Sequence, residues 1–137
     1  MRISTKGRYA IRIMLDLSQH IGEGYISLKK TSERQEISLK YLEAIVAILN
    51  KAGMVESFRG KDGGYKLTRR PEEYTIGSII KLTEGSIAPV SCLDGSTNSC
   101  VRACQCLTLP MWLKLEGIVD EYLESVTLKE LLDKNIK

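Results

Sequence analysis

Apolar residues recur every three to four positions in three stretches of the first half of the chain, a spacing that predicts amphipathic helices. We expect these helices over residues 4–21, 28–33 and 39–52. Ser27 and Ser38 stand directly before the second and third helices, where a hydroxyl can accept a hydrogen bond from the first turn. The third helix has one continuous apolar stripe, which consists of Leu42, Ile45, Val46 and Leu49.

After the third helix the pattern changes to short β-prone runs. Residues 55–58 and 65–67 flank a glycine-rich centre at 59–64, which predicts a β-hairpin. A helix, a turn, a second helix and a hairpin in this order are typical of a winged helix-turn-helix, which places its second helix in the DNA major groove. Any one of these elements by itself is usually only a helix or a turn. Their order and their short connections are what favour DNA binding.

The second half of the chain is less regular. Thr75 should cap a short helix, whereas residues 86–109 show no period. Pro110 suits the first turn of a longer helix that ends near residue 125, and Thr127 with Glu130 forms a capping box for a last short helix. The longer helix has an apolar face broad enough to favour packing against a second copy of the chain over packing on its own domain. The members of this face are Met111, Trp112, Leu115, Ile118, Val119, Tyr122 and Leu123.

These elements predict a fold that is mainly α with a small β wing, a winged helix-turn-helix with a long C-terminal dimerisation helix. We expect three parts: a DNA-binding domain at 1–85, a cysteine-rich loop at 86–109, and the dimerisation helix with the short C-terminal helix at 110–137. A length of 137 residues, 43% of them hydrophobic, suffices for one compact domain with an appendage.

Charge is distributed unevenly along the chain. Residues 1–74 carry 14 Lys and Arg against 9 Asp and Glu, whereas residues 75–137 carry 6 against 8. The basic half therefore coincides with the part expected to bind DNA. No apolar run has the length of a signal peptide core or a membrane span, so we expect a cytoplasmic protein without a membrane partner.

A catalytic role finds little support in the sequence, and we expect no enzyme. The single histidine, His20, lies late in the first helix, and no Cys/His, Ser/His or paired-carboxylate arrangement stands out. Gly63 and Gly64 lack the frame of a phosphate-binding loop.

The four cysteines of the chain lie within 15 residues, in the spacing C-x7-C-x3-C-x-C. They are Cys92, Cys100, Cys104 and Cys106. Thiolates are soft ligands that select zinc, copper(I) or iron–sulfur clusters. The spacings of zinc ribbons and ferredoxins are absent. The cysteines therefore indicate a thiolate metal site or a redox switch and leave the choice between them open.

Several segments resemble the IscR-type (Rrf-two) family of bacterial transcription regulators, and together they extend over essentially the whole chain. They are residues 1–10, Tyr41-Leu42-Glu43, Ala52-Gly53, Arg59-Gly60, Gly63-Gly64-Tyr65, Cys106-Leu107-Thr108, Trp112 and Thr127-Leu128. The resemblance implies a homodimeric winged-helix protein whose subunits pair through the long helix near the C-terminus. It also implies that three cysteines of the loop hold an iron–sulfur cluster, [2Fe–2S] in preference to [4Fe–4S].

Three positions match the ligands of that family: Cys92, Cys100 and Cys106. The family completes its site with a histidine or with an acid from the first helix. Leu109 and Arg8 occupy these two positions here, so neither fourth ligand is present. Cys104 is the additional thiol that can supply it, and a small molecule or another residue is the alternative.

The resemblance further implies that DNA is contacted by the N-terminus of the first helix, by the recognition helix and by the wing. The matching residues are Ser4, Thr5, Lys6, Lys40, Tyr41, Glu43, Arg59 and Gly60. Position 44, often a glutamine in the family, is Ala44 here, which removes one possible base contact.

We therefore expect a homodimeric transcription regulator, a repressor, that binds a pseudo-palindromic site in double-stranded promoter DNA. Its DNA binding should depend on an iron–sulfur cluster or on the redox state of the thiols. One alternative is a cluster-free winged-helix repressor controlled by a regulatory protein partner or by cysteine oxidation. Another is an iron–sulfur electron carrier or cluster scaffold.

Overall fold

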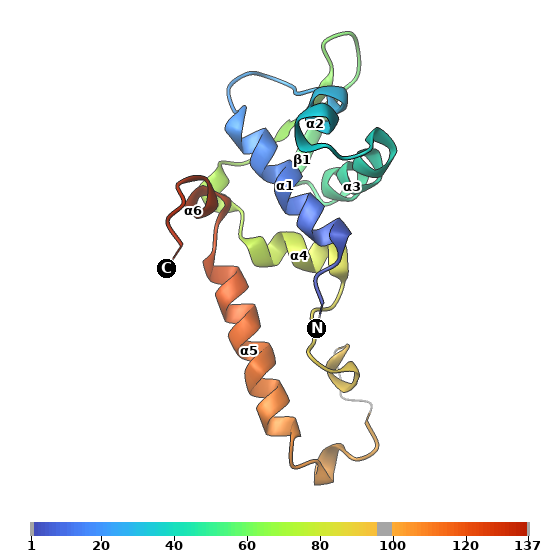
Figure 1. The fold of residues 1–137 in the computed structure, drawn as a ribbon, viewed down its shortest axis with the longest axis vertical. Coiled ribbons are helices and arrows are strands. Elements are labelled where there is room, and N and C mark those ends of the chain that lie inside the picture. The colour runs from blue at the N-terminus through green and yellow to red at the C-terminus, as the bar shows by residue number, and fades with distance from the viewer. Residues whose placement is uncertain (1, 96–99, 137) are drawn as a thin grey trace.

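The computed structural model describes residues 2–95 and 100–136, so residues 96–99 of the expected cysteine-rich loop lie outside the described residues. Helices, short 3-10 turns and one two-stranded sheet follow one another along the chain (Figure 1). In chain order they are α1 (Thr5–Gln19), α2 (Leu28–Gln35), α3 (Leu39–Lys51), β1 (Val55–Phe58), β2 (Gly64–Leu67), η1 (Pro71–Glu73), α4 (Ile76–Glu84), η2 (Ser91–Leu93), η3 (Ala103–Gln105), α5 (Leu109–Ser125) and α6 (Leu128–Leu132). The expected fold, mainly α with a small β wing, is confirmed.

The helices begin at the residues that the sequence marks as caps. The hydroxyls of Ser27, Ser38, Thr75 and Thr127 each accept a hydrogen bond from the backbone N–H three residues later. The expected helix ends differ by one or two residues. α2 continues to Gln35 because the chain leaves helical geometry only at Glu36, whose φ is +55°.

The core lies where α1, α3 and α4 meet. The apolar stripe expected on α3 is fully buried, and it packs against Ile13 and Met14 of α1 and Ile79 of α4 in one cluster. α6 also belongs to this core, since the side chain of Leu128 is fully buried. The backbone joins α6 to the segment before α4, because the N–H of Leu128 donates to the carbonyl of Tyr74 at 3.1 Å. The short C-terminal helix therefore packs in the same core as α1, α3 and α4, although its place in the sequence groups it with the expected dimerisation helix.

The wing is an antiparallel hairpin in which Val55 pairs with Leu67 and Phe58 with Gly64. The segment before α2 extends this sheet, because Ile26 and Tyr65 exchange two backbone hydrogen bonds of 2.8 and 2.9 Å. Gly64 approaches the carbonyl of Ile26 so closely that a Cβ at this position would overlap it. The hairpin is thereby fixed to the helix-turn-helix at the start of α2.

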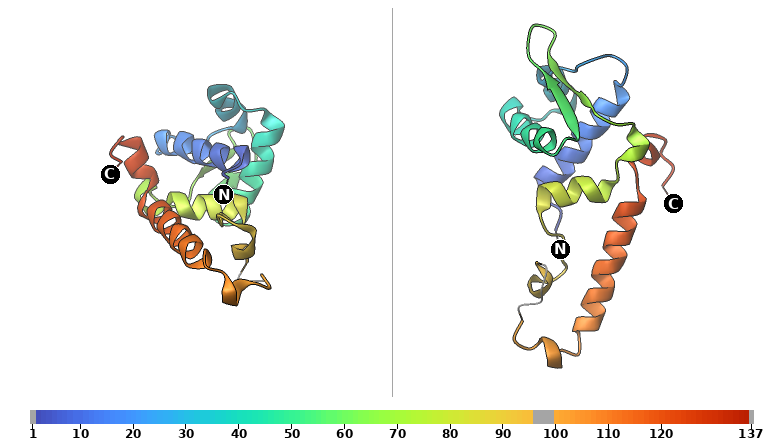
Figure 2. Two further views of the ribbon diagram at one scale, coloured as in Figure 1. Left: turned by 60° about the horizontal axis from the view of Figure 1, so that its bottom comes forward. Right: turned by 180° about the vertical axis from the view of Figure 1, so that it is seen from behind.

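α5 extends away from the rest of the molecule, and the cysteine-rich loop lies beside it (Figures 1 and 2). No described residue of α5 is buried. Lys81 of α4 holds the C-terminal half of the helix through ion pairs with Asp120 and, at 3.0 Å, Glu124. No helix in the described part of the chain combines the length and apolar character needed to cross a membrane.

Candidate DNA-binding surface and cysteine-rich loop

The N-terminal end of α3 is presented to solvent. Ser38 caps the helix, and Lys40, Tyr41 and Glu43 follow as exposed residues on the face opposite the buried stripe. Tyr41 is also the point where α3 meets α1, since its ring packs edge-on against Tyr9 with centroids 5.7 Å apart. The structure therefore brings the expected recognition helix next to the first half of α1.

The first turn of α1 carries three of the expected contact residues, and their surroundings differ. Ser4 is the cap of α1 and is also bonded to Glu84. Thr5 accepts a hydrogen bond of 3.2 Å from the guanidinium of Arg8. Lys6 takes part in no ion pair among residues 2–95 and 100–136. Of the three side chains, Lys6 is thus the one available to an anion.

The tip of the wing lies at the other end of this surface. Arg59 and Gly60 are exposed at the tip, which projects beyond α2 and away from the N-terminus of α1 (Figures 1 and 2). Lys61 lines a pocket there together with Ser27 and Lys30 at the start of α2. In the described part of the chain no acidic side chain pairs with Arg59 or Lys61.

A partly buried ion pair that the sequence did not reveal holds α2 against α1. The carboxylate of Asp16, near the C-terminal end of α1, accepts hydrogen bonds from Arg34 and Gln35 at the end of α2. Burial alone would raise the pKa of Asp16, but the bonds from Arg34 and Gln35 and the charge of Arg34 outweigh it and hold the pKa below its ordinary value. The sequence signal for this pair is Asp16 itself, a charged residue at a position of α1 that faces the core.

A second unforeseen group ties the wing to the body of the domain. The hydroxyl of Tyr74, whose side chain is buried, donates to the carbonyl of Met54 at 2.7 Å. The same oxygen accepts from the backbone N–H groups of Thr68 and Arg69, each at 3.0 Å. One phenol thus joins the chain before β1 to the chain after β2.

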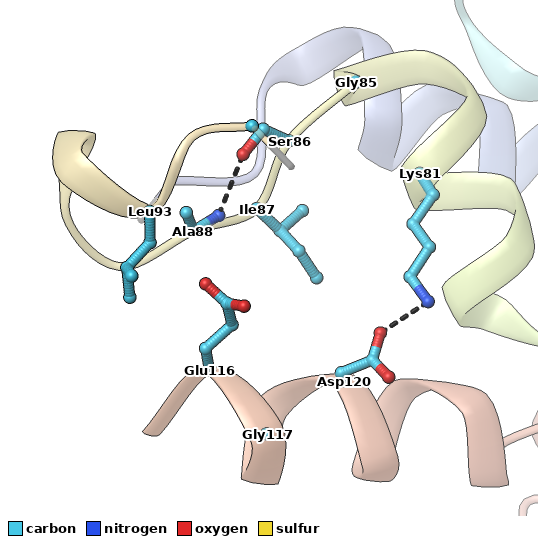
Figure 3. A pocket seen from close by; sticks show the side chains of 10 residues that line it. Lys81, Gly85, Ser86, Ile87, Ala88, Leu93, Glu116, Gly117 and Asp120 are labelled. Carbon is cyan, nitrogen blue, oxygen red and sulfur yellow. Dashed lines mark hydrogen bonds and ion pairs between the residues drawn. The ribbon is translucent and has the colours of Figure 1, made fainter. Parts of the chain in front are cut away.

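The cysteine-rich loop starts against α5. Gly85, Ser86, Ile87 and Ala88 line a pocket with Glu116 and Asp120 of α5, and Glu116 points toward the loop (Figure 3). One oxygen of Glu116 is buried without a hydrogen-bond partner in the described structure. The stretch that leads to Cys92 therefore packs across the long helix.

The cysteines are distributed over two parts of the loop. Cys92 lies in η2, near the end of α4, whereas Cys104 lies in η3, near the start of α5. Cys100 and Cys106 line one pocket together with Arg102 and Thr108. Within residues 2–95 and 100–136, no three cysteine, histidine or acidic side chains come together in a group able to hold a metal. The chemistry of the donors suits a cluster, but the arrangement brings together only two of the three expected ligands.

The surroundings of Cys106 favour ionisation of its thiol. Its sulfur lies 3.3 Å from the hydroxyl of Thr108. Hydrogen bonding to Thr108, through both its side chain and its backbone, lowers the pKa of Cys106, and the backbone of Leu109 and the charge of Arg102 act in the same direction. Ionised thiols are the form that binds metals and reacts with oxidants.

Comparisons with known proteins agree with this geometry. The family model described as "Rrf2: Iron-dependent Transcriptional regulator" matches residues 3–134. The HTH-type transcriptional regulator IscR of Aliivibrio salmonicida is 38% identical over 135 residues, which cover 98% of this chain and 79% of that protein. Among solved structures, CymR, the global cysteine regulator of B. subtilis, has a TM-score of 0.79 at 38% identity and 98% coverage of both chains. T. potens IscR has a TM-score of 0.76 at 40% identity, with 98% of this chain and 88% of that chain covered.

Proposed function

This chain belongs to the Rrf2 family of transcription regulators, and from that premise we propose that it is a homodimeric repressor whose affinity for DNA depends on its cysteine-rich loop. That it is a DNA-binding regulator and not an enzyme follows from the family. The pairing of subunits, the direction of control and the nature of the signal are the proposal.

The proposed DNA-binding surface is supported mainly by exposed cationic side chains that have no acidic partner in the described residues. Lys40 lies at the free end of α3 and Arg59 at the tip of the wing, and neither forms an ion pair in the described residues. In a winged helix the first position faces the major groove and its flanking phosphates, and the second faces the backbone or a narrow minor groove. Tyr41 and Glu43 are placed to read base edges.

Pairing through α5 is supported by an apolar stripe that the protomer leaves exposed. The side chains of Met111, Ile118 and Tyr122 are 53%, 52% and 48% exposed, and their spacing of seven and four residues puts them on one face of the helix. Lys81 and the cysteine-rich loop contact the opposite face, which includes Glu116 and Asp120. A two-fold dimer would bind two half-sites about one helical turn apart.

Control by the cysteine-rich loop is supported by its place in the chain. The loop joins α4 of the DNA-binding domain to the start of the pairing helix. The family model is described as iron-dependent, and Cys92, Cys100 and Cys106 are the residues that would hold an iron–sulfur cluster. In the structure described here Cys92 lies outside the pocket that Cys100 and Cys106 share. The ligand set is therefore not assembled, and a bound cluster would require a different path of the loop.

Oxidation of the thiols without a cluster is a second candidate, and one observation favours it. Cys106 has a lowered pKa, and Cys104, two residues away, is exposed. An oxidised form of CymR from Staphylococcus aureus is among the similar structures. For the present chain, a thiol with a lowered pKa two residues from a second accessible thiol has the chemistry of a reversible switch.

Anaerobic purification tests the two signals against each other. A coloured protein with iron and sulfide in stoichiometric amounts supports the cluster, and a colourless protein with reversible disulfides supports oxidation. DNA affinity at fixed salt is then compared between the wild type and the variant Cys92→Ser/Cys100→Ser/Cys106→Ser. Equal affinity and equal site preference in all states would exclude the loop as the sensor.

A further inference from the structure

The carboxylate of Glu84, the last residue of α4, lies on the first turn of α1. Its Oε1 accepts a hydrogen bond of 3.1 Å from the backbone N–H of Ser4 and a second bond from the Ser4 hydroxyl. The Ser4 hydroxyl in turn accepts from the N–H of Gly7 at 3.2 Å. A Cβ at Gly7 would overlap Oε1 of Glu84, so glycine leaves the space that the carboxylate occupies.

This contact places a negative charge where a helix attracts one. The free N–H groups of a helix N-terminus and its dipole bind anions, and here part of that capacity is taken by a residue of the protein itself. Ser4 is thereby fixed to α4, and the exposed Thr5 and the adjacent Lys6 follow it directly in the chain. The position of the residues expected to face DNA thus depends on α4.

Glu84 is also the residue at which the cysteine-rich loop begins. Gly85 ends α4 with φ +77°, and its N–H donates to the backbone carbonyl of Lys81 at 3.0 Å. After Gly85, residues Ser86 and Ile87 line a pocket with α5, and Lys81 of α4 is paired with Asp120 of α5 (Figure 3). Figure 1 shows the end of α4, the start of the loop and the start of α1 side by side. The loop is therefore separated from Glu84 in the chain by no more than the turn at Gly85.

We propose that Glu84 is a positioning residue for DNA binding, which transmits the state of the cysteine-rich loop to the first turn of α1. The inference rests on the proposed contact between that turn and DNA. In one state of the loop Oε1 holds Ser4 as seen here, and Lys6 is aligned with a phosphate. When the loop moves, the two bonds at Oε1 change, and the first turn loses its alignment.

A purely structural role makes a different prediction from this one. A structural cap stabilises the domain and leaves the response of DNA binding to the loop unchanged. A positioning residue alters that response at equal stability. Two substitutions separate these cases: Glu84→Gln keeps an oxygen that can accept both bonds from Ser4, and Glu84→Ala removes the acceptor.

The experiment uses the full chain and a duplex that the wild type has selected from a randomised pool. DNA affinity is measured at fixed salt with the thiols reduced and with the thiols alkylated by iodoacetamide, which changes the loop directly. Alkylation is expected to change the affinity of the wild type by about fivefold or more, the lower range of ordinary coupling. Glu84→Gln should keep this response, and Glu84→Ala should lose it.

The matched control is Glu72→Gln, which removes the same charge from an exposed ion pair with Arg70 in η1. It should respond as the wild type does. Thermal unfolding of each variant verifies that the domain is intact. If Glu84→Ala does not fold, Glu84→Asp takes its place, because its side chain is one methylene shorter and cannot reach Ser4 in the same way.

Lys6→Ala distinguishes this inference from the proposed function. Loss of affinity in Lys6→Ala together with an unaltered response in Glu84→Ala overturns the role of Glu84 and leaves the DNA contact standing. Full affinity in Lys6→Ala shows that the first turn of α1 does not contact DNA through Lys6. That result overturns both the DNA contact and the role of Glu84 in aligning it. A wild type whose affinity is unaffected by alkylation also overturns the transmission from the loop.

Discussion

Arg34 of α2 holds the carboxylate of Asp16 in α1 through two hydrogen bonds, 2.6 Å to Oδ1 and 3.0 Å to Oδ2. Asp16 is 1% exposed, and Gln35 adds a third bond of 2.9 Å. α2 contributes one buried side chain of its own, Thr31. This polar contact therefore adds to the few apolar contacts that hold α2 against α1.

Loss of Arg34 should destabilise the domain more than loss of a surface arginine. Arg34→Ala leaves the buried carboxylate of Asp16 without its charge partner, which costs about 3–5 kcal/mol when both partners are fully buried. Because the side chain of Arg34 is 34% exposed, solvent screening reduces the expected loss to about 2–3 kcal/mol. Urea unfolding measures it. The control is Arg70→Ala, whose side chain is 76% exposed, and an equal loss in the two variants would contradict the account.

The same pair should make stability depend on acid. The pKa of Asp16 is lowered in the folded protein, so its contribution is fully present above the pKa of the unfolded chain, about 3.9, and is lost as pH falls through the folded value. In Asp16→Asn the free energy of unfolding should therefore fall less steeply between pH 5 and pH 3 than in the wild type. Urea unfolding across this range provides the measurement, and parallel curves would exclude Asp16 as a source of the acid sensitivity.

Local signals in the sequence were enough to place most of the fold. The hydroxyl at Ser38 and the stripe that begins at Leu42 are read from residues a few positions apart, and the structure follows them. Asp16 was not foreseen as a buried ion, because its partner Arg34 lies in another helix and only the packing of the two helices brings them together. The burial of Leu128 was not foreseen for a similar reason: a helix of five residues is too short to show which neighbour covers it.

The candidate site was predictable to different degrees. The free ends of α3 and the wing follow from the order of elements, and the structure leaves Lys40 and Arg59 exposed as that order suggests. The roles of these residues stay predictions. The contact of Ser4 with Glu84 joins residues 80 positions apart, and no local sequence pattern predicts it. The path of the cysteine-rich loop is likewise not fixed by cysteine spacing.

Removal of the Tyr74 hydroxyl should loosen the base of the wing. Tyr74→Phe keeps the ring and removes three hydrogen bonds, one to the carbonyl of Met54 and two from the backbone N–H groups of Thr68 and Arg69. The carbonyl of Met54 then keeps only the longer bonds from Thr68, at 3.3 and 3.4 Å. Buried groups that lose a partner cost about 1–3 kcal/mol, so we expect a lower melting temperature and faster amide exchange at Thr68. Tyr25→Phe is the control, since its ring stacks near Phe58 and no hydrogen bond of its hydroxyl is seen in the described structure. Equal behaviour of the two variants would contradict the role of Tyr74.

Alanine at Gly7 should be harmful only while Glu84 is present. Gly7→Ala forces a methyl group against Oε1 of Glu84, and overpacking of this kind costs about 1–3 kcal/mol. In the double variant with Glu84→Ala the collision is removed, and the second substitution should recover most of that loss. Gly117→Ala, on α5 with open space around the new methyl group, should instead stabilise by about 0.5–1 kcal/mol. Additive losses in the double variant would show that the two residues do not compete for one space.

Phosphate contacts by α3 and the wing have a signature in the salt dependence of binding. Each phosphate that loses its cation lowers the slope of log K against log salt by about 0.9, so Lys40→Ala and Arg59→Ala should each reduce the slope by one such step. Lys129→Ala provides the control, because this lysine lies on α6 and is paired with Asp133 at 3.2 Å. Affinity is measured by titration of a duplex from low to physiological salt. A reduced slope for Lys40 alone would limit the phosphate contacts to the recognition helix. An unchanged slope in both variants would mean that the DNA lies on another face of the winged helix.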